Sequence, residues 1–327
     1  MTDTLSVTRA VTRHSIRAAA GRIAPHIRRT PLLRLAGADL GLPHAVTLKL
    51  ELLQASGSFK PRGAFNTMLS TGLSAPLPAA GVIAASGGNH GAAVAYAARA
   101  LGVRAEIFVP EITGPAKRAR IEGYGARLVV GGAAYDEARR ASEVRAAETG
   151  ALQVHAYDQD TVLAGQGTVA LEFAEDAPDL THVLVATGGG GLIGGMAAWY
   201  AGSGTQVISV EPEGCPTLAT ALRAGRPVPA PVGGLAADSL GARQVGTLMF
   251  AVAQRHVAQA VLVPDAAIRA AQRLLWEAAR LVAEPGGATA LAALLCGAWT
   301  APAGARVGVL VCGGNCDPGS VSGNMTD

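Results

Sequence analysis

The sequence predicts an α/β protein with two open parallel sheets, each covered by helices, and a cleft between the two units. Its length of 327 residues leaves room for about two domains. Half of the residues are hydrophobic and only 16% are charged, which supports packed cores and excludes a disordered chain. From about residue 81 onward, short apolar runs alternate with amphipathic segments. That order is typical of parallel strands joined by helices.

The first series of strands and helices begins at this point of the chain. Apolar runs predict buried strands at residues 81–85, 105–110, 127–130 and 152–155. Pro115 fits the first position of the helix that follows the second strand. Gly150 ends a charged amphipathic helix over residues 135–149.

A second series completes the chain and sets the predicted domain boundaries. Strands are predicted at residues 46–51, 182–187, 206–211, 260–263 and 306–311. Helices are predicted at residues 161–175, 192–201, 265–282 and 287–296, and a surface loop rich in Pro and Gly at 225–234. We assign residues 1–66 and 152–327 to a larger domain and residues 67–151 to a smaller inserted domain.

Charge and cysteine content argue against several classes of function. The 27 basic and 24 acidic residues leave a net charge of +3, which is small for a protein of nucleic acids or membrane surfaces. The basic pair Lys117-Arg118 fits a solvated helix face. None of the four cysteines lies in a C-x-x-C pair, so we expect reduced thiols in the cytoplasm. The uncharged stretch 183–201 is long enough to cross a bilayer, but its central glycines favour strand, loop and helix.

Lys60 is the sharpest local signal. Pro61 fits the first position of a helix, which puts Lys60 at or beside the helix N-cap, with a backbone pushed away from the right-handed helical region. The positive end of the helix dipole disfavours an ammonium group there. A lysine so placed suits Schiff-base chemistry. A lone lysine beside a proline is more often a surface residue, so the interpretation depends on other motifs.

Two glycine-rich loops supply that support, since each follows a predicted strand and precedes a predicted helix. Residues 86–91 read Ser-Gly-Gly-Asn-His-Gly, and residues 188–192 read Gly-Gly-Gly-Gly-Leu. Helix N-termini offer free amides to anions, and glycines let a phosphate approach the backbone closely. The first loop is equally explained as an ordinary turn with an Asn cap. Gly189, Gly191 and Gly194 fit the dinucleotide pattern G-x-G-x-x-G with Glu211 downstream, so nucleotide binding stays open at this point.

In this order, the motifs together resemble those of the fold-type II pyridoxal-phosphate (PLP) enzymes, and most closely the threonine/serine dehydratases and serine racemases. The resemblance extends over nearly the whole chain, from Thr30-Pro-Leu to Cys312-Gly-Gly-Asn. It implies the two-domain fold of the tryptophan synthase β type, with the active site in the cleft between the domains.

The resemblance also implies site residues. Lys60 would hold the cofactor covalently and later move the α-proton. Contacts to PLP would come from Phe59, Lys60, Asn89, Gly188, Gly189, Gly190, Gly191, Leu192, Glu284 and Cys312. The substrate carboxylate would bind at Ser86, Gly87, Gly88, Asn89 and His90. Glu284 is equally explained as a helix cap, and Cys312 as the buried end of a strand.

The activity implied is β-elimination from L-threonine or L-serine, which yields a 2-oxo acid and ammonia. A 3-hydroxyaspartate dehydratase, an amino-acid racemase and a non-catalytic binding protein remain alternatives. Racemases of this group carry a second base, a serine immediately before the Gly-Asn pair, where this chain has Gly87. We therefore expect dehydration, acting on a small amino acid and on neither nucleic acid nor membrane, in a homodimer.

A cation site is the least supported feature of the resemblance. The racemases bind a metal at a glutamate equivalent to Glu211 and at an acidic residue six positions later, where this chain has Thr217. A divalent or monovalent cation at Glu211 is therefore left open.

Overall fold

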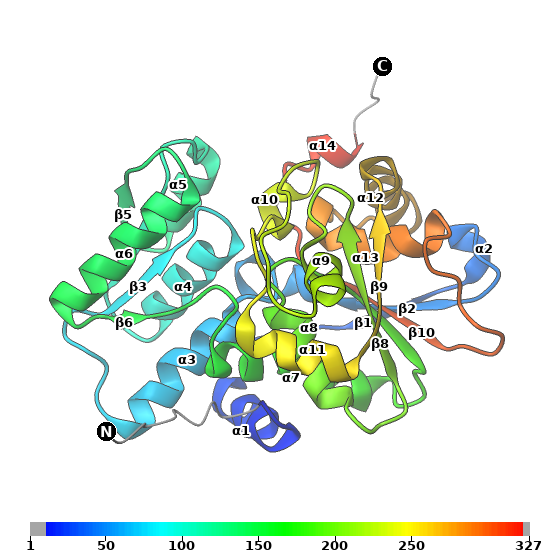
Figure 1. The fold of residues 1–327 in the computed structure, drawn as a ribbon, viewed down its shortest axis with the longest axis horizontal. Coiled ribbons are helices and arrows are strands. Elements are labelled where there is room, and N and C mark those ends of the chain that lie inside the picture. The colour runs from blue at the N-terminus through cyan, green and yellow to red at the C-terminus, as the bar shows by residue number, and fades with distance from the viewer. Residues whose placement is uncertain (1–10, 323–327) are drawn as a thin grey trace.

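The computed structural model describes residues 11–322 as two αβ units side by side (Figure 1). The larger unit holds a six-stranded sheet in the order β1-β2-β10-β7-β8-β9, and the smaller one a four-stranded sheet in the order β5-β4-β3-β6. Both sheets are open, and the fold class expected from the sequence is confirmed. One edge strand differs from that expectation, because β1 runs antiparallel to β2.

The larger sheet is built from short strands, of which the central ones are buried and rich in Val. Its strands are β1 (Leu32–Leu35), β2 (Val46–Leu50), β7 (His182–Ala186), β8 (Gln206–Pro212), β9 (Val257–Val263) and β10 (Val307–Val311). Its helices are α1 (Arg13–Ile23), α2 (Gly37–Leu40), α7 (Asp160–Asp176), α8 (Gly191–Tyr200), α9 (Thr217–Ala224), α10 (Ala237–Leu240), α11 (Thr247–His256), α12 (Asp265–Ala279), α13 (Pro285–Leu295) and α14 (Gly319–Ser322). Two short 3₁₀ turns, η1 (Glu51–Leu53) and η2 (Ala55–Gly57), follow β2. The main hydrophobic core of the protein lies between this sheet and its helices.

The smaller unit contains β3 (Val82–Ala85), β4 (Ala105–Val109), β5 (Arg127–Val130), β6 (Leu152–Gln153), α4 (Asn89–Ala100), α5 (Pro115–Gly123) and α6 (Tyr135–Thr149). Helix α3 (Pro61–Ser74) connects the units, because it begins directly after Lys60 and contributes Phe65 and Met68 to the core of the smaller one. β6 pairs with β3, although the sequence placed this strand at the start of the larger domain. The smaller sheet therefore extends at least to residue 153.

The stretch 183–201 forms the rest of β7, a turn and α8, as the glycines predicted. Within residues 11–322, no helix combines the length and the apolar character needed to cross a membrane. The carboxyl ends of β3, β7 and β10 lead into residues 86–90, 187–190 and 312–315 respectively. In open parallel sheets, ligands bind beyond these ends of the strands.

Candidate active site

Lys60 lies at the N-cap of α3, at the junction of the two units, with Pro61 in the first turn. Its backbone is right-handed helical, with φ −57° and ψ −33°, so the expectation that the proline would exclude this region is wrong. The reason is local: the amide of Arg62 donates to the carbonyl of Phe59 at 3.2 Å and closes a turn around Lys60. That hydrogen bond outweighs the preference of a residue before proline for extended backbone.

The side chain of Lys60 is partly buried at this junction. Its Nζ donates to the carbonyl oxygen of Ala156 at 2.9 Å and lies 5.1 Å from the centre of the Phe59 ring. Burial lowers the pKa of Lys60 to about 8, although the negative charge of Glu284 acts in the opposite direction. A neutral amine, which is the nucleophilic form, is therefore accessible near physiological pH.

Glu284 and Asn89 meet across the cleft. Asn89 Nδ2 donates to Glu284 Oε1 at 2.6 Å, and Asn315 Nδ2 donates to Asn89 Oδ1 at 2.7 Å. Glu284 is the N-cap residue of α13, but its side chain forms no capping hydrogen bond, so the capping explanation is wrong. Burial raises the pKa of Glu284 to about 7, against the hydrogen bond from Asn89. This carboxyl group thus exists in both protonation states near neutrality.

Cys312 follows β10 and faces the same junction. Its Sγ lies 3.4 Å from the carbonyl oxygen of Gly286, and its own carbonyl accepts a hydrogen bond from the amide of Phe59 at 3.1 Å. Burial raises the pKa of the Cys312 thiol, and Glu284 raises it further, so the thiol is neutral. The end of β10 therefore fixes the segment that carries Lys60.

The tetraglycine loop connects β7 to α8 and sits at the N-terminus of that helix. The first turn of a helix leaves amides without intrahelical acceptors, and no acceptor is recorded among the described residues for the amides of residues 188–192. The glycines are required by the protein's own packing: a Cβ at Gly188 would lie 2.6 Å from the carbonyl of Leu240. At Gly189 it would overlap the ring of Tyr157, and at Gly190, where φ is +91°, the side chain of Met249.

The loop over residues 86–90 connects β3 to α4. Ser86 Oγ accepts a hydrogen bond from the amide of Gly88 at 3.1 Å, and Asn89 opens the helix. His90 is buried, and its Nε2 lies 2.9 Å from the carbonyl of Val154. Burial lowers the pKa of His90 to about 3, with Lys60 acting in the same direction. The ring of His90 is therefore neutral and contacts the smaller unit.

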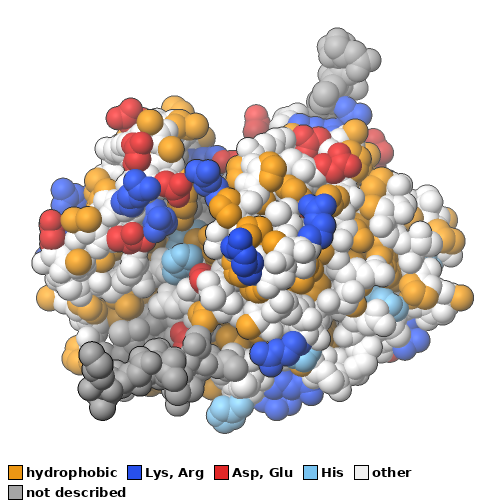
Figure 2. All heavy atoms as spheres, viewed as in Figure 1, with side chains coloured by type: hydrophobic (Ala, Val, Ile, Leu, Met, Phe, Trp, Pro, Cys, Tyr) orange, Lys and Arg blue, Asp and Glu red, His pale blue; other side chains and the backbone are white. Residues whose placement is uncertain are grey.

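Sequence reasoning missed the charged border of this cleft. A small hollow opens beside these residues, and Figure 2 shows basic side chains where the two units meet. It is lined by Gly87, Gly88, Asn89, Ala92, Lys117, Arg120, Asp238, Ser239, Glu284 and Asn315. Lys117 remains accessible to solvent and also pairs with Asp238 of α10 across the cleft. Nothing in the local pattern of α5 signals this, since the partner lies in the other unit.

A buried ion network supports the start of α3. Arg62 donates to Glu51 at 2.7 and 2.8 Å and to Glu172 at 2.7 and 2.9 Å, and Lys49 donates to Glu172 at 2.8 Å. Burial alone would lower the pKa of Arg62, but Glu51 and Glu172 outweigh it and raise this pKa. The network joins β2, α3 and α7 two residues after Lys60 in the chain. The sequence analysis did not identify it.

Glu211 is buried at the end of β8 and caps α9. Its two carboxylate oxygens accept hydrogen bonds from the amides of Leu218 and Ala219, at 2.6 and 2.8 Å. Burial raises the pKa of Glu211 to about 7. No group of three or more His, Cys, Asp or Glu side chains suited to a metal ion occurs within residues 11–322.

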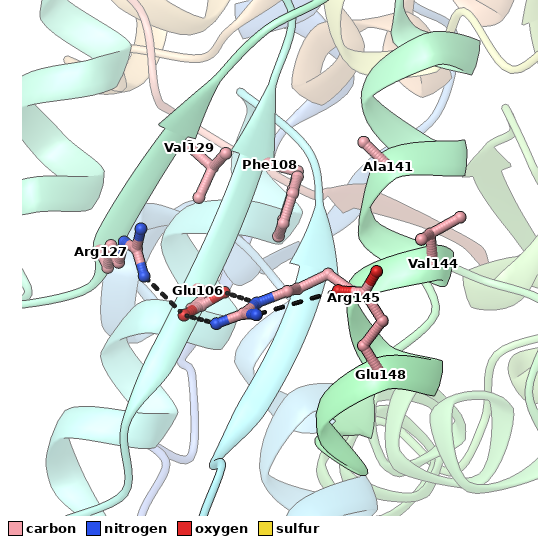
Figure 3. A pocket seen from close by; sticks show the side chains of 8 residues that line it. All are labelled: Glu106, Phe108, Arg127, Val129, Ala141, Val144, Arg145 and Glu148. Atoms are coloured by element: carbon pink, nitrogen blue, oxygen red, sulfur yellow. Dashed lines mark hydrogen bonds and ion pairs between the residues drawn. The ribbon is translucent and has the colours of Figure 1, made fainter.

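A second hollow lies on the smaller unit, between its sheet and α6, and contains none of these residues (Figure 3). Its charged side chains pair with one another: Glu106 accepts hydrogen bonds from Arg127 at 3.1 Å and from Arg145 at 3.2 Å. The cleft, in contrast, combines a reactive amine, a carboxyl group and helix N-termini.

Known proteins that resemble this chain include enzymes whose cofactor suits the groups in the cleft. The model of the pyridoxal-phosphate dependent enzyme family matches residues 23–313. The chain belongs to this family. It is 39% identical to the L-threonine ammonia-lyase of Geobacter sulfurreducens, over 94% of this chain and 76% of that protein. It is also 39% identical to the phenylserine dehydratase of Ralstonia pickettii, over 90% of each protein. The structure of maize serine racemase superposes with a TM-score of 0.88 at 33% identity, covering 95% of both chains.

The residues present fit PLP. The tetraglycine loop ends a strand at the start of a ten-residue helix and offers amides to a phosphate. Lys60 supplies an amine with a lowered pKa. In the same part of the protein, the buried Ser58 Oγ and Gln166 Oε1 have no hydrogen-bond partner among the described residues. These donor, acceptor and nucleophile groups suit a phosphorylated aldehyde. A dinucleotide site would need Glu211 as its acidic residue, but the carboxylate of Glu211 is used to cap α9.

Proposed function

We propose that this protein eliminates water from 3-hydroxy amino acids, with L-threonine and L-serine as substrates, to give a 2-oxo acid and ammonia. The observation that carries the proposal is the lowered pKa of Lys60 in a cleft that also holds a neutral thiol and an anion-binding loop. The ammonia-lyase and dehydratase relatives support the same reaction class.

When bound, PLP withdraws electrons from the α-carbon of an attached amino acid, and the residues of this chain do the rest. Lys60 would bind the cofactor and afterwards accept the α-proton at Nζ. The amides of residues 188–192 would hold the phosphate, and Asn89 would orient the ring. Cys312, as a neutral thiol, would leave the ring nitrogen without the full charge that an aspartate would stabilise. This restraint favours elimination over transamination.

Gly87, which stands where the racemases carry a second base, disfavours racemisation. A Cβ at Gly87 would lie 2.6 Å from Cγ2 and 2.7 Å from Oγ1 of Thr113, so Thr113 fills the space that a serine side chain would need. A second base at position 87 is thus absent, and there is no room for one without a change at Thr113. D-serine formed from L-serine at a rate comparable to pyruvate would contradict this interpretation.

The test of the proposed function is a substrate panel with the purified protein and PLP. We expect a visible absorption band from the lysine-bound cofactor, and 2-oxo acid and ammonia from L-serine and L-threonine. Lys60→Ala should lose the band and at least about 100-fold of the activity while its circular dichroism is unchanged. Wild-type protein that stays colourless with PLP would exclude the proposal, as would a coloured protein that releases no 2-oxo acid from any 3-hydroxy amino acid.

A further inference from the structure

Asn89 of the smaller unit is held by two residues of the larger one, and all three line the hollow beside Lys60. Its Oδ1 accepts a hydrogen bond from Asn315 Nδ2 at 2.7 Å, and its Nδ2 donates to Glu284 Oε1 at 2.6 Å. An asparagine amide nitrogen carries two donor hydrogens. No second acceptor for Asn89 Nδ2 is found among residues 11–322. One amide hydrogen of Asn89 therefore remains for a ligand in the cleft.

Asn315 sets the direction of the Asn89 amide. Its Nδ2 also donates to the carbonyl oxygen of Ser56 at 2.8 Å. A carbonyl oxygen can only accept, so this bond decides which end of the Asn315 amide is its NH₂ group. The same NH₂ group faces Asn89, and a donor there requires the oxygen of Asn89 to face it. The nitrogen of Asn89 is consequently turned toward Glu284.

The acceptor that orients Asn315 lies in a tightly defined turn. Ser56 and Gly57 both have positive φ, 58° and 78°, and the amide of Gly314 donates to the carbonyl of Gly57 at 2.9 Å. A Cβ at Gly57 would overlap the side-chain oxygen of Asn315, so the glycine makes room for this asparagine. Asn315 is therefore oriented by a fixed backbone group and not by a mobile side chain.

A purely structural explanation is that Asn315 only ties the loop after β10 to the segment before α3. Backbone hydrogen bonds already make that connection, since the amide of Phe59 donates to the carbonyl of Cys312 at 3.1 Å. The bond from Asn315 to Asn89 instead crosses to the other unit and ends at the N-terminus of α4. Loop closure does not account for this bond.

We propose that Asn315 is a positioning residue, which keeps the amide nitrogen of Asn89 turned into the cleft so that Asn89 donates to the ring oxygen of PLP. This inference rests on the cofactor and the activity proposed above. A donor at that oxygen favours its deprotonated form, the form that absorbs visible light when PLP is bound to lysine. Without Asn315, the amide of Asn89 can turn over and present its oxygen, which is an acceptor.

The test is the absorption spectrum of the holoenzyme at one fixed pH, for the wild type, Asn315→Ala and Asn315→Asp. We expect the ratio of visible to near-ultraviolet absorption to fall by about 3- to 10-fold in Asn315→Ala, the effect of one hydrogen bond. Asn315→Asp should lower it further, because a carboxylate only accepts and draws the nitrogen of Asn89 toward itself. If Asn315 mattered only through its shape, the isosteric Asp would stay closer to the wild type than Ala.

A matched control is Asn66→Asp, the same substitution at an asparagine of α3. Asn66 Nδ2 donates to the carbonyl of Thr161 at 2.6 Å, and Asn66 does not line the hollow. Its substitution should leave the absorption ratio at the wild-type value, whatever it does to the urea midpoint. Asn315 is half-buried in a loop, so we expect its variants to keep the wild-type circular dichroism.

Asn89→Ala provides the comparison that isolates positioning. If Asn315 acts through Asn89, adding Asn315→Ala to Asn89→Ala changes the absorption ratio no further. Equal effects of Asn315→Ala with and without Asn89 would overturn the inference. So would an Asn315→Ala spectrum identical to that of the wild type, or an Asn315→Asp ratio closer to the wild type than that of Asn315→Ala.

Release of 2-oxo acid from L-serine by the same proteins separates this inference from the proposed function. If the wild type shows the visible band but releases no 2-oxo acid, the proposed function fails, and the absorption ratios still test Asn315. If the wild type is active and the ratios do not change, the inference fails and the proposed function stands. A wild type that shows no visible band with PLP would exclude both.

Discussion

Lys60 and Arg62 are two residues apart at the start of α3, and each belongs to a different group of ionisable side chains. The two groups differ in whether their charges have opposite partners. In the network of Arg62, Lys49, Glu51 and Glu172, every charge has an opposite partner within hydrogen-bond distance. In the cleft, and among residues 11–322, Lys60 donates only to a neutral carbonyl and Glu284 accepts only from neutral groups. Burial therefore shifts the pKa of Lys60 and of Glu284 toward the neutral form.

The difference shows how the same burial produces support in one place and reactivity in another. Paired charges stay ionised, because each partner replaces the water that the other has lost. In the network, hydrogen bonds from Arg62 lower the pKa of Glu172 even though burial alone would raise it. Where such partners are missing, the neutral amine needed for chemistry becomes accessible.

Breaking the paired network should give the largest effect. Arg62→Met removes one cation and leaves Glu51 and Glu172 buried without their main partner. Loss of one member of a buried pair costs about 3–5 kcal/mol. We expect the urea midpoint to fall sharply. Arg145→Met is the matched control, since Arg145 pairs with Glu106 at the surface, and it should leave the midpoint unchanged. Equal urea midpoints for the two variants would contradict the claim that the buried network contributes more to stability than the surface pair.

The second prediction concerns the unpaired amine. PLP added to cofactor-free protein reacts with neutral Lys60, so the rate at which the visible band appears should rise with pH and reach half its maximum near the folded pKa of about 8. Free N-acetyl-lysine, with a pKa of about 10.4, is the reference and should still be rising at that pH. A protein midpoint that coincides with the reference would mean that the cleft does not favour the neutral amine.

The smallest effect is expected for Glu284→Gln, on the pH dependence of the urea midpoint. Its folded pKa of about 7 lies above the ordinary value of 4.5, so the protonated form stabilises the fold below pH 4.5 and this contribution is lost as pH rises through about 7. Glu284→Gln cannot titrate. The wild type should therefore lose stability relative to the variant as pH rises: the urea midpoint of the cofactor-free variant, minus that of the cofactor-free wild type, should increase between about pH 5 and about pH 8. Glu211, whose pKa is also raised to about 7, is present in both proteins and cancels. If the difference between the two urea midpoints does not change with pH, Glu284 does not have a raised pKa in the folded protein.

Much of the fold was predictable because its elements carry local signals. Apolar runs identified most strands of both sheets, and the helix over 135–149 was predicted with its observed ends. The edge strand β1 and helix α11 were missed, since a four-residue edge strand and a helix without a side-chain cap leave weak patterns. β6 was found but assigned to the wrong unit, because pairing with β3 is a contact between distant segments.

The sequence by itself determined the family resemblance, the place of Lys60 before Pro61, and the two strand-to-helix loops, because these are contiguous motifs whose backbone requirements depend on Gly, Pro and Asn. Only the tertiary structure decided which charges are paired. It joined Arg62 to Glu172, Lys117 to Asp238 and Asn89 to Glu284. The physical reason is that a pKa and a charge balance depend on burial and on neighbours brought from other elements, which no local pattern encodes.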